Sequence, residues 1–329
     1  MYDLREFIRW VCGNVENHRM SSGGYARWTK QNDKNNRDLG INVYGTANAI
    51  NIYYTCNMMQ DNSWRRHTAE VLQKFQDKET GLLEGDGLNP IHTTAFVSGA
   101  LELVDEKLLC PITALEKYKD KEELRSLLDS IDWAEQPWVG SHKGAGIYGA
   151  MVLNGYGDVD WQNNYFEWFA NNADEQTGLW KKGCITDKIP FFHYLASTFH
   201  YIFNFEYAKR PIPYPQQLTK TCIDAYDNGK CAEFGKGFGY NEIDFLYMLN
   251  HAQRRCGKYF DDVQRITEET ADKFFKNLLS ADWENSLALD DLHTLFAVIS
   301  AAAMIQEALP GKVITDKPLR LVIDRRPFL

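Results

Sequence analysis

The feature of this sequence that most limits its fold is a segment that recurs six times at a nearly constant spacing. Five copies begin with a small or polar residue and the fourth with an aromatic pair, and each continues as an apolar stretch rich in small side chains. The copies begin at Asn42, His92, Gly144, Phe191, Asn241 and Asp291, which are 47 to 52 residues apart. A fixed period of this size indicates one supersecondary unit repeated along the chain.

More polar, amphipathic segments precede the apolar ones. They span residues 2–17, 64–76, 121–131, 161–172, 215–226 and 263–279. An amphipathic helix buries one face, whereas a helix that is apolar nearly all round must be buried on most faces. Six outer and six inner helices therefore predict an all-α fold, the (α/α)6 barrel, or toroid, of six helical hairpins. An open solenoid of helix pairs is the alternative, but neither end of the chain resembles the polar cap that a solenoid needs.

The repeat covers most of the 329 residues, so we expect residues 1–310 to form a single toroid domain. Residues 311–329 follow the last repeat and are expected to form an extended tail packed on the barrel. They contain the one convincing extended stretch, VITDKPLRLVI, in which Pro318 suits an edge strand or a tail.

Charge and composition exclude several classes of partner. With 36 basic and 45 acidic residues, the formal net charge is −9, and no basic run stands out, which argues against a nucleic-acid partner. No apolar stretch is long enough for a transmembrane helix, so no membrane partner is expected. The seven cysteines show no C-x-x-C spacing, which favours reduced thiols in a cytoplasmic protein. A secreted protein whose signal peptide has been removed would have the same composition.

The inner helices of such a barrel run in one direction, so their N-termini gather at one mouth with the loops that precede them. Two of these loops, residues 77–92 and 174–193, share the pattern D-x-x-T-G-L and end in a histidine. The six helix entrances carry Tyr44, His92, His142, His193, Tyr240, Glu242, Asp244, Asp290, Asp291 and His293. Titratable groups that converge in a concave mouth predict an active site, and helix N-termini there suit an anionic or polar ligand.

The carboxylates among these residues also have structural explanations. Either Asp290 or Asp291 can cap the last inner helix. Asp244 lies between Ile243 and Phe245 on a helix predicted to be buried, so it needs either a partner or a function. A salt bridge to one of the neighbouring arginines at positions 254 and 255 and a functional role are equally consistent with the sequence.

Three further residues have two explanations each. His200 is expected to be a hydrogen-bonded core histidine rather than a ligand. Trp180, at the end of the second D-x-x-T-G-L pattern, is either a stacking platform for a sugar ring or an anchor for its loop. Asp86 is expected to be a turn residue that can also reach the mouth.

The hairpin count, the helix direction and the loops DKETGLL and DEQTGLW resemble the six-hairpin glycosidase superfamily. The loops are similar to those of the unsaturated glucuronyl hydrolases, and the layout is similar to prenyltransferase and terpene-cyclase toroids. The sequence lacks the D-x-D-D, D-D-x-x-D and Q-x-x-x-G-x-W motifs of the cyclases and the C-H-G zinc ligands of the lanthionine cyclases. Glycosidases need only two carboxylates across a cleft, so the resemblance implies a carbohydrate-active enzyme.

The leading hypothesis is therefore a glycoside hydrolase, or a lyase, that acts on a small-molecule or oligosaccharide ligand without a metal or other cofactor. Asp244 would be the acid and Asp290 or Asp291 the base. The residues expected to bind substrate are Tyr44, His92, His142, Trp180, His193, Tyr240, Glu242 and His293. Pairs of these histidines can instead serve as the acid and base of a sugar epimerase.

Two other hypotheses come from different classes of protein. The first is a non-catalytic toroid, either a scaffold or a glycan-binding protein, in which Asp244 would be locked against a neighbouring arginine away from the cavity. The second is a metal site in which His92, His193 and His293 hold zinc with one open position.

Overall fold

The computed structural model describes residues 1–86 and 88–329, and it is predominantly helical. Buried helices alternate with amphipathic ones along the described chain, as the periodicity predicts. The buried set comprises α2 (Val43–Thr55), α4 (Pro90–Glu102), α6 (Pro137–Leu153), α8 (Phe192–Tyr207), α10 (Asn241–Cys256) and α12 (Leu292–Ala308). The amphipathic set comprises α1 (Arg5–Asn17), α3 (Asn62–Gln73), α5 (Lys121–Asp129), α7 (Val159–Asn172), α9 (Pro215–Asp227) and α11 (Phe260–Ser280).

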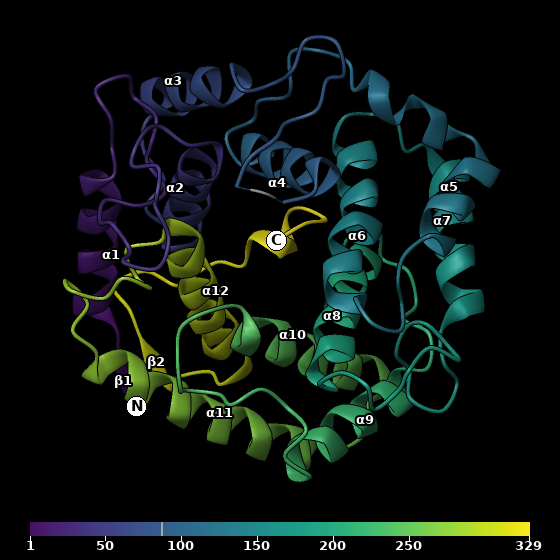
Figure 1. The fold of residues 1–329 in the computed structure, drawn as a ribbon. Coiled ribbons are helices and arrows are strands. Elements are labelled where there is room, and N and C mark those ends of the chain that lie inside the picture. Colours follow the sequence, from purple (N-terminus) through teal and green to yellow (C-terminus); the bar gives the residue numbers. More distant parts are fainter. Residues whose placement is uncertain (87) are drawn as a thin grey trace.

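The six buried helices contact one another in chain order. α2 packs against α4, α4 against α6, α6 against α8, α8 against α10 and α10 against α12. The series returns to its start because α12 also packs against α2. Figure 1 shows the amphipathic helices at the periphery of this arrangement. A helix that is apolar on one face is expected to pack that face against the rest of the fold.

Side chains at the helix starts explain where several buried helices begin. Asn42 accepts hydrogen bonds from the backbone N–H groups of Tyr44 and Gly45 at the start of α2. Asp291 accepts one from the N–H of His293 at the start of α12. These caps satisfy donors that have no partner within the helix.

The third buried helix begins earlier than its apolar stretch indicates. α6 begins at Pro137 rather than near Gly144, because a proline suits the first position of a helix, where its missing N–H costs nothing. The sequence pattern places His142 in the loop before this helix. In the structure, His142 lies inside the helix.

The C-terminal segment is less extended than expected and enters the ring of helices. Its only strand in the described structure, β2 (Val313–Ile314), pairs in parallel with β1 (Tyr2–Asp3). A short 3₁₀ helix, η2 (Val322–Asp324), follows, and the C-terminus lies among the buried helices in Figure 1. A second 3₁₀ helix, η1 (Thr113–Lys119), precedes α5.

Buried contacts hold this segment in place. The Asn204 side-chain amide donates to the Pro327 carbonyl oxygen at 2.7 Å, and the Phe328 ring lies 5.2 Å from the His92 ring. Gly99 of α4 leaves room for the fully buried Arg326, because a Cβ there would lie 2.6 Å from an Arg326 side-chain nitrogen. No helix in the described ranges combines the length and the apolar character needed to cross a membrane.

Candidate functional site

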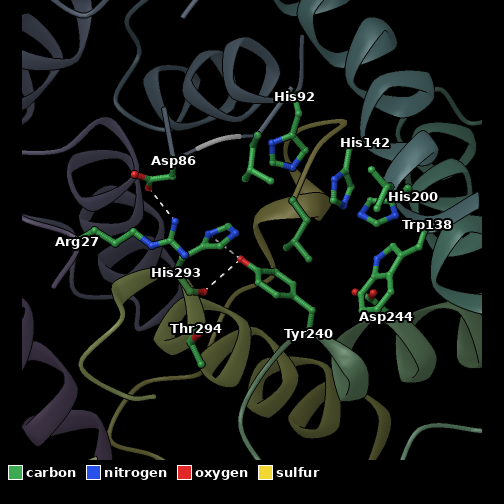
Figure 2. A pocket seen from close by; sticks show the side chains of 13 residues that line it. Arg27, Asp86, His92, Trp138, His142, His200, Tyr240, Asp244, His293 and Thr294 are labelled. Atoms are coloured by element: carbon green, nitrogen blue, oxygen red, sulfur yellow. Dashed lines mark hydrogen bonds and ion pairs between the residues drawn. The ribbon is translucent and has the colours of Figure 1, made fainter. Parts of the chain in front are cut away.

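A cavity of about 420 Å³ lies at the N-terminal ends of the buried helices, within the roughly 300–1,000 Å³ typical of small-molecule sites. Four histidines line it: His92, His142, His200 and His293. The other polar side chains in its lining are Arg27, Asp86, Trp138, Tyr240, Asp244 and Thr294. Figure 2 shows these ten side chains around one space, contributed by α4, α6, α8, α10, α12 and two loops.

Asp244 is a buried carboxyl group without a hydrogen-bond partner among the described residues. It is 1% exposed, and neither of its oxygens accepts a hydrogen bond. Burial raises its pKa well above the ordinary value, and the nearby Glu242 adds to the effect. A carboxyl group in this environment holds its proton and is suited to donate it.

The arginines next in the sequence do not neutralise Asp244. Arg254 lies 2.6 Å from a Glu307 carboxylate oxygen, and Arg255 Nε donates to Glu206 at 2.8 Å. Asp244 instead faces the cavity from the first turn of α10. This is the opposite of the arrangement expected for a locked structural salt bridge.

Three of the histidines form a row along one side of the cavity. The His92 and His142 ring centroids are 4.8 Å apart, and those of His142 and His200 are 5.3 Å apart. Burial lowers the pKa of His142 to about 4 and lowers the pKa values of His92 and His200 well below the usual range. All three imidazoles are therefore neutral at pH 7 and can accept protons.

The two outer members of this row are held by hydrogen bonds, and the middle one is not. His92 Nδ1 lies 2.9 Å from Tyr44 Oη. His200 Nδ1 donates to the Ala196 carbonyl oxygen at 2.9 Å, which leaves Nε2 as an acceptor. His142 makes no hydrogen bond to the residues that the structure describes, so its ring nitrogens are available to a ligand.

His293 and Tyr240 form a second pair at the cavity. Tyr240 Oη lies 2.9 Å from His293 Nδ1 and 3.2 Å from the His293 carbonyl oxygen. Burial lowers the pKa of His293 to about 3, and the charge of Arg27 contributes in the same direction. The pair joins the starts of α10 and α12 and presents a hydroxyl group beside a neutral imidazole.

Arg27 is ion-paired with two carboxylates at the edge of the cavity. Its Nε and one terminal nitrogen donate to Asp291 at 2.8 and 2.9 Å, and its other terminal nitrogen donates to Asp86 at 2.7 Å. Burial opposes ionisation of Asp291, but the hydrogen bonds and charge of Arg27 outweigh it and lower the pKa of Asp291. Asp291 also caps α12, so it is not a free base of the kind the sequence suggested.

Asp290, the other candidate base, lies outside the cavity lining, as Asp291 does. Its carboxylate accepts hydrogen bonds from the backbone N–H of Lys30 at 3.1 Å and from the Arg37 side chain at 3.2 Å. The Thr29 N–H donates to it at 3.2 Å. These contacts tie the loop after α1 to the start of α12, which is a structural role.

Four of the expected substrate-binding residues also lie outside the lining. Trp180 is fully buried, and its Nε1 donates to the Phe169 carbonyl oxygen at 2.7 Å, so it anchors its loop and does not present a stacking face. Glu242 is buried, and its side chain accepts the Gly235 N–H at 2.9 Å. Tyr44 is fully buried and does not line the cavity, but its hydroxyl group contacts His92, which does.

His193 is the fourth of these residues, and it contacts Trp138 at 5.5 Å between ring centroids instead of lining the cavity. The proposed zinc ligands His92, His193 and His293 therefore do not come together. More generally, no group of three or more His, Cys, Asp or Glu side chains in the part of the chain described here is arranged to hold a metal ion.

Sequence reasoning missed several residues of the cavity. Arg27 lies between α1 and α2, outside the repeated segments, and no motif marks it. Trp138 lies on the early turn of α6 that the apolar pattern does not reveal. His200 was expected in the core, and it is buried there, but its ring also lines the cavity.

Comparison with known proteins adds no relative from which to transfer a function. The sequence matches no protein-family profile, no curated protein and no solved structure. The cavity therefore has to be interpreted from its own chemistry.

Proposed function

We propose that this chain is an (α/α)6 toroid of the six-hairpin glycosidase type and that it hydrolyses a glycosidic bond in the cavity at the inner-helix N-termini. The alternation of buried and amphipathic helices supports the toroid. The contacts between α12 and α2 support a closed arrangement, which an open solenoid would lack.

One observation carries the enzymatic part of the proposal. Asp244, a buried carboxyl group without a hydrogen-bond partner among the described residues, lines the same small cavity as four imidazoles. Burial raises the pKa of this carboxyl group and lowers the pKa of the His142 imidazole. Environments that separate the pKa values of neighbouring groups in this way are typical of acid–base catalysis. A scaffold protein gains nothing from a buried carboxyl group without a partner, because such a group destabilises the fold.

In the proposed reaction, Asp244 donates its proton to the glycosidic oxygen as the bond from that oxygen to the anomeric carbon breaks. Water attacks the anomeric carbon, and its proton passes to His142. A pKa of about 4 gives this imidazole the basicity of the carboxylate that usually assists water in an inverting glycosidase. His142 thus replaces the second carboxylate that the sequence assigned to Asp290 or Asp291.

The remaining cavity residues would bind the sugar. Trp138 lines the same cavity as Asp244 and offers an aromatic surface to a sugar ring. The groups placed to hydrogen-bond hydroxyls are His92, His200, Tyr240 and His293. Neutral imidazoles and a phenol supply both donors and acceptors, which suits a polyhydroxylated ligand.

The test is hydrolysis of a panel of chromogenic glycosides by the wild-type protein, Asp244→Asn and His142→Gln. We expect each substitution to reduce kcat/KM by at least about 100-fold, as loss of a general acid or base does. Glu135→Gln, an exposed carboxylate change near the start of α6, is the matched control and should retain full activity. Full activity of Asp244→Asn on any glycoside that the wild type cleaves would contradict the proposal.

A sugar epimerase is the second candidate, because His92 and His142 line the same cavity and neutral imidazoles can remove and return a proton. The two reactions differ in deuterium oxide. Epimerisation places deuterium on a carbon of the recovered sugar, whereas hydrolysis labels only exchangeable oxygens. Proton NMR of the products of a panel of reducing sugars separates them.

A further inference from the structure

The charges around the cavity bear on which sugars it can accept. Within the described lining, Arg27 is the one permanently charged cationic side chain. All three of its nitrogens donate to carboxylates, two to Asp291 and one to Asp86, at 2.7 to 2.9 Å. Two carboxylates against one guanidinium leave this edge of the cavity with a net charge of about −1 at neutral pH.

The N-termini of α2 and α12 do not offset this charge, because polar side chains already cap them. The start of α12 is capped by the Asp291 carboxylate, and that of α2 by the Asn42 side chain. The positive end of each of these helices therefore already has an acceptor or an acidic group of its own.

The other polar groups of the lining add no positive charge. Burial holds the four imidazoles in their neutral form at pH 7. Trp138, Tyr240 and Thr294 are uncharged. A bound carboxylate or phosphate would lose its hydration without gaining a free cationic partner, which is unfavourable in a partly buried site.

We propose that the cavity accepts electrically neutral sugars and discriminates against uronates and sugar phosphates, with the Arg27–Asp86–Asp291 cluster as the discriminating element. This inference rests on the proposed function and narrows it. It also departs from what the resemblance to the unsaturated glucuronyl hydrolases implies, namely an anionic substrate. All three Arg27 nitrogens already donate to Asp86 and Asp291, so Arg27 has a structural role at the cavity and is not available to bind an anion.

Asp86→Asn is the decisive variant. Asp86 has a φ of 54°, a left-handed conformation that asparagine tolerates well. The new side-chain oxygen can still accept the hydrogen bond that Asn42 donates at 3.0 Å. The substitution thus removes one charge and frees one face of Arg27 with little change in shape. Glu84→Gln, an exposed charge change on the same loop, is the matched control.

The experiment measures binding of matched pairs by calorimetry at low salt: glucose with glucuronate, galactose with galacturonate, and glucose with glucose 6-phosphate. For the wild type, we expect the neutral member of the best-bound pair to bind at least about tenfold more tightly, with the difference shrinking as salt screens the repulsion. Asp86→Asn should reduce this ratio at least about threefold, and Glu84→Gln should leave it unchanged.

The outcomes separate this inference from the function on which it rests. Equal or tighter binding of the anionic sugar by the wild type, or a ratio that Asp86→Asn does not change, overturns the inference and leaves a carbohydrate site in place. Absence of binding for every pair, neutral and anionic, overturns both. A neutral preference that Asp86→Asn weakens and Glu84→Gln does not is the result that supports it.

Discussion

Tyr44 Oη lies 2.9 Å from His92 Nδ1, and the same hydroxyl lies 3.0 Å from Thr93 Oγ1. The tyrosine is fully buried on α2 and does not line the cavity, whereas the histidine on α4 does. With Nδ1 engaged, Nε2 is the His92 nitrogen left for a ligand. Tyr44 is therefore a positioning residue that fixes the orientation of a cavity imidazole.

We expect Tyr44→Phe to lower kcat/KM about tenfold, because the His92 imidazole that would bind the sugar loses the hydrogen bond that orients it. Loss of one buried hydrogen bond costs about 1 kcal/mol of stability, so the protein should stay folded. Steady-state kinetics and a thermal melt measure both effects. Tyr148→Phe is the control, since it removes a hydroxyl that bonds Gln162 instead. Equal kinetic effects of the two changes would contradict a positioning role.

Asp244→Asn should raise the melting temperature at neutral pH even though it removes activity. The folded-state pKa of Asp244 lies above its unfolded value, so the carboxyl group destabilises the fold as pH rises from its unfolded pKa through its folded pKa. Asparagine removes that cost. The stabilisation should be larger at pH 8 than at pH 5, and melts at the two pH values test this. A variant that is less stable at pH 8 would mean that the carboxylate has a stabilising partner.

Asp290, by contrast, should be needed for stability. It is 3% exposed and accepts hydrogen bonds from Arg37 and two backbone N–H groups. Removing one partner of a buried ion pair typically costs about 3–5 kcal/mol, so Asp290→Ala should lower the free energy of unfolding by that amount. Asp316→Ala breaks an exposed pair with Arg9 and should cost less than about 1 kcal/mol. Urea denaturation of both variants makes the comparison.

The number and order of the helices could be predicted from the sequence because the burial of helix faces requires apolar residues at regular positions. A buried helix must be apolar on most faces and an amphipathic one on a single face, so the pattern alone predicts the twelve α-helices found in residues 1–86 and 88–329. The start of α6 escaped prediction because Pro137 begins the helix before the apolar stretch does. The helix begins about two turns before the apolar stretch, so His142 lies inside it. For the same reason, the sequence pattern does not place Trp138 on this helix.

The cavity could be predicted only in part, because a sequence shows where a residue lies on its helix but not what pairs with it. Asp244 stands out in the sequence because a carboxyl group within an apolar run has no local explanation. Asp290 and Asp291 are adjacent and equally acidic, and only the fold places Arg37 against one and Arg27 against the other. Arg27 itself lies in a loop, where no periodicity marks the side chains that turn inward.

The cavity histidines should make the protein less stable as the pH falls below neutrality. Burial lowers the pKa of His142 from its ordinary value of 6.5, which we assign to the unfolded chain, to about 4 in the folded protein. Between pH 4 and pH 6.5 the unfolded chain therefore binds more protons than the folded protein. Stability therefore rises with pH through this window and is lost as the pH falls from about 6.5 towards 4. For His142 alone, the loss reaches about 3 kcal/mol.

Urea denaturation at pH 7.5 and pH 5 measures this dependence. His142→Gln removes one titrating group and should flatten the slope, because the remaining buried histidines still contribute. His67→Gln, which changes an exposed histidine on α3, should leave the slope as it is in the wild type. Identical slopes for wild type and His142→Gln would mean that the His142 imidazole is as well solvated in the folded protein as in the unfolded chain. It would then lack the depressed pKa that the proposed reaction requires of its base.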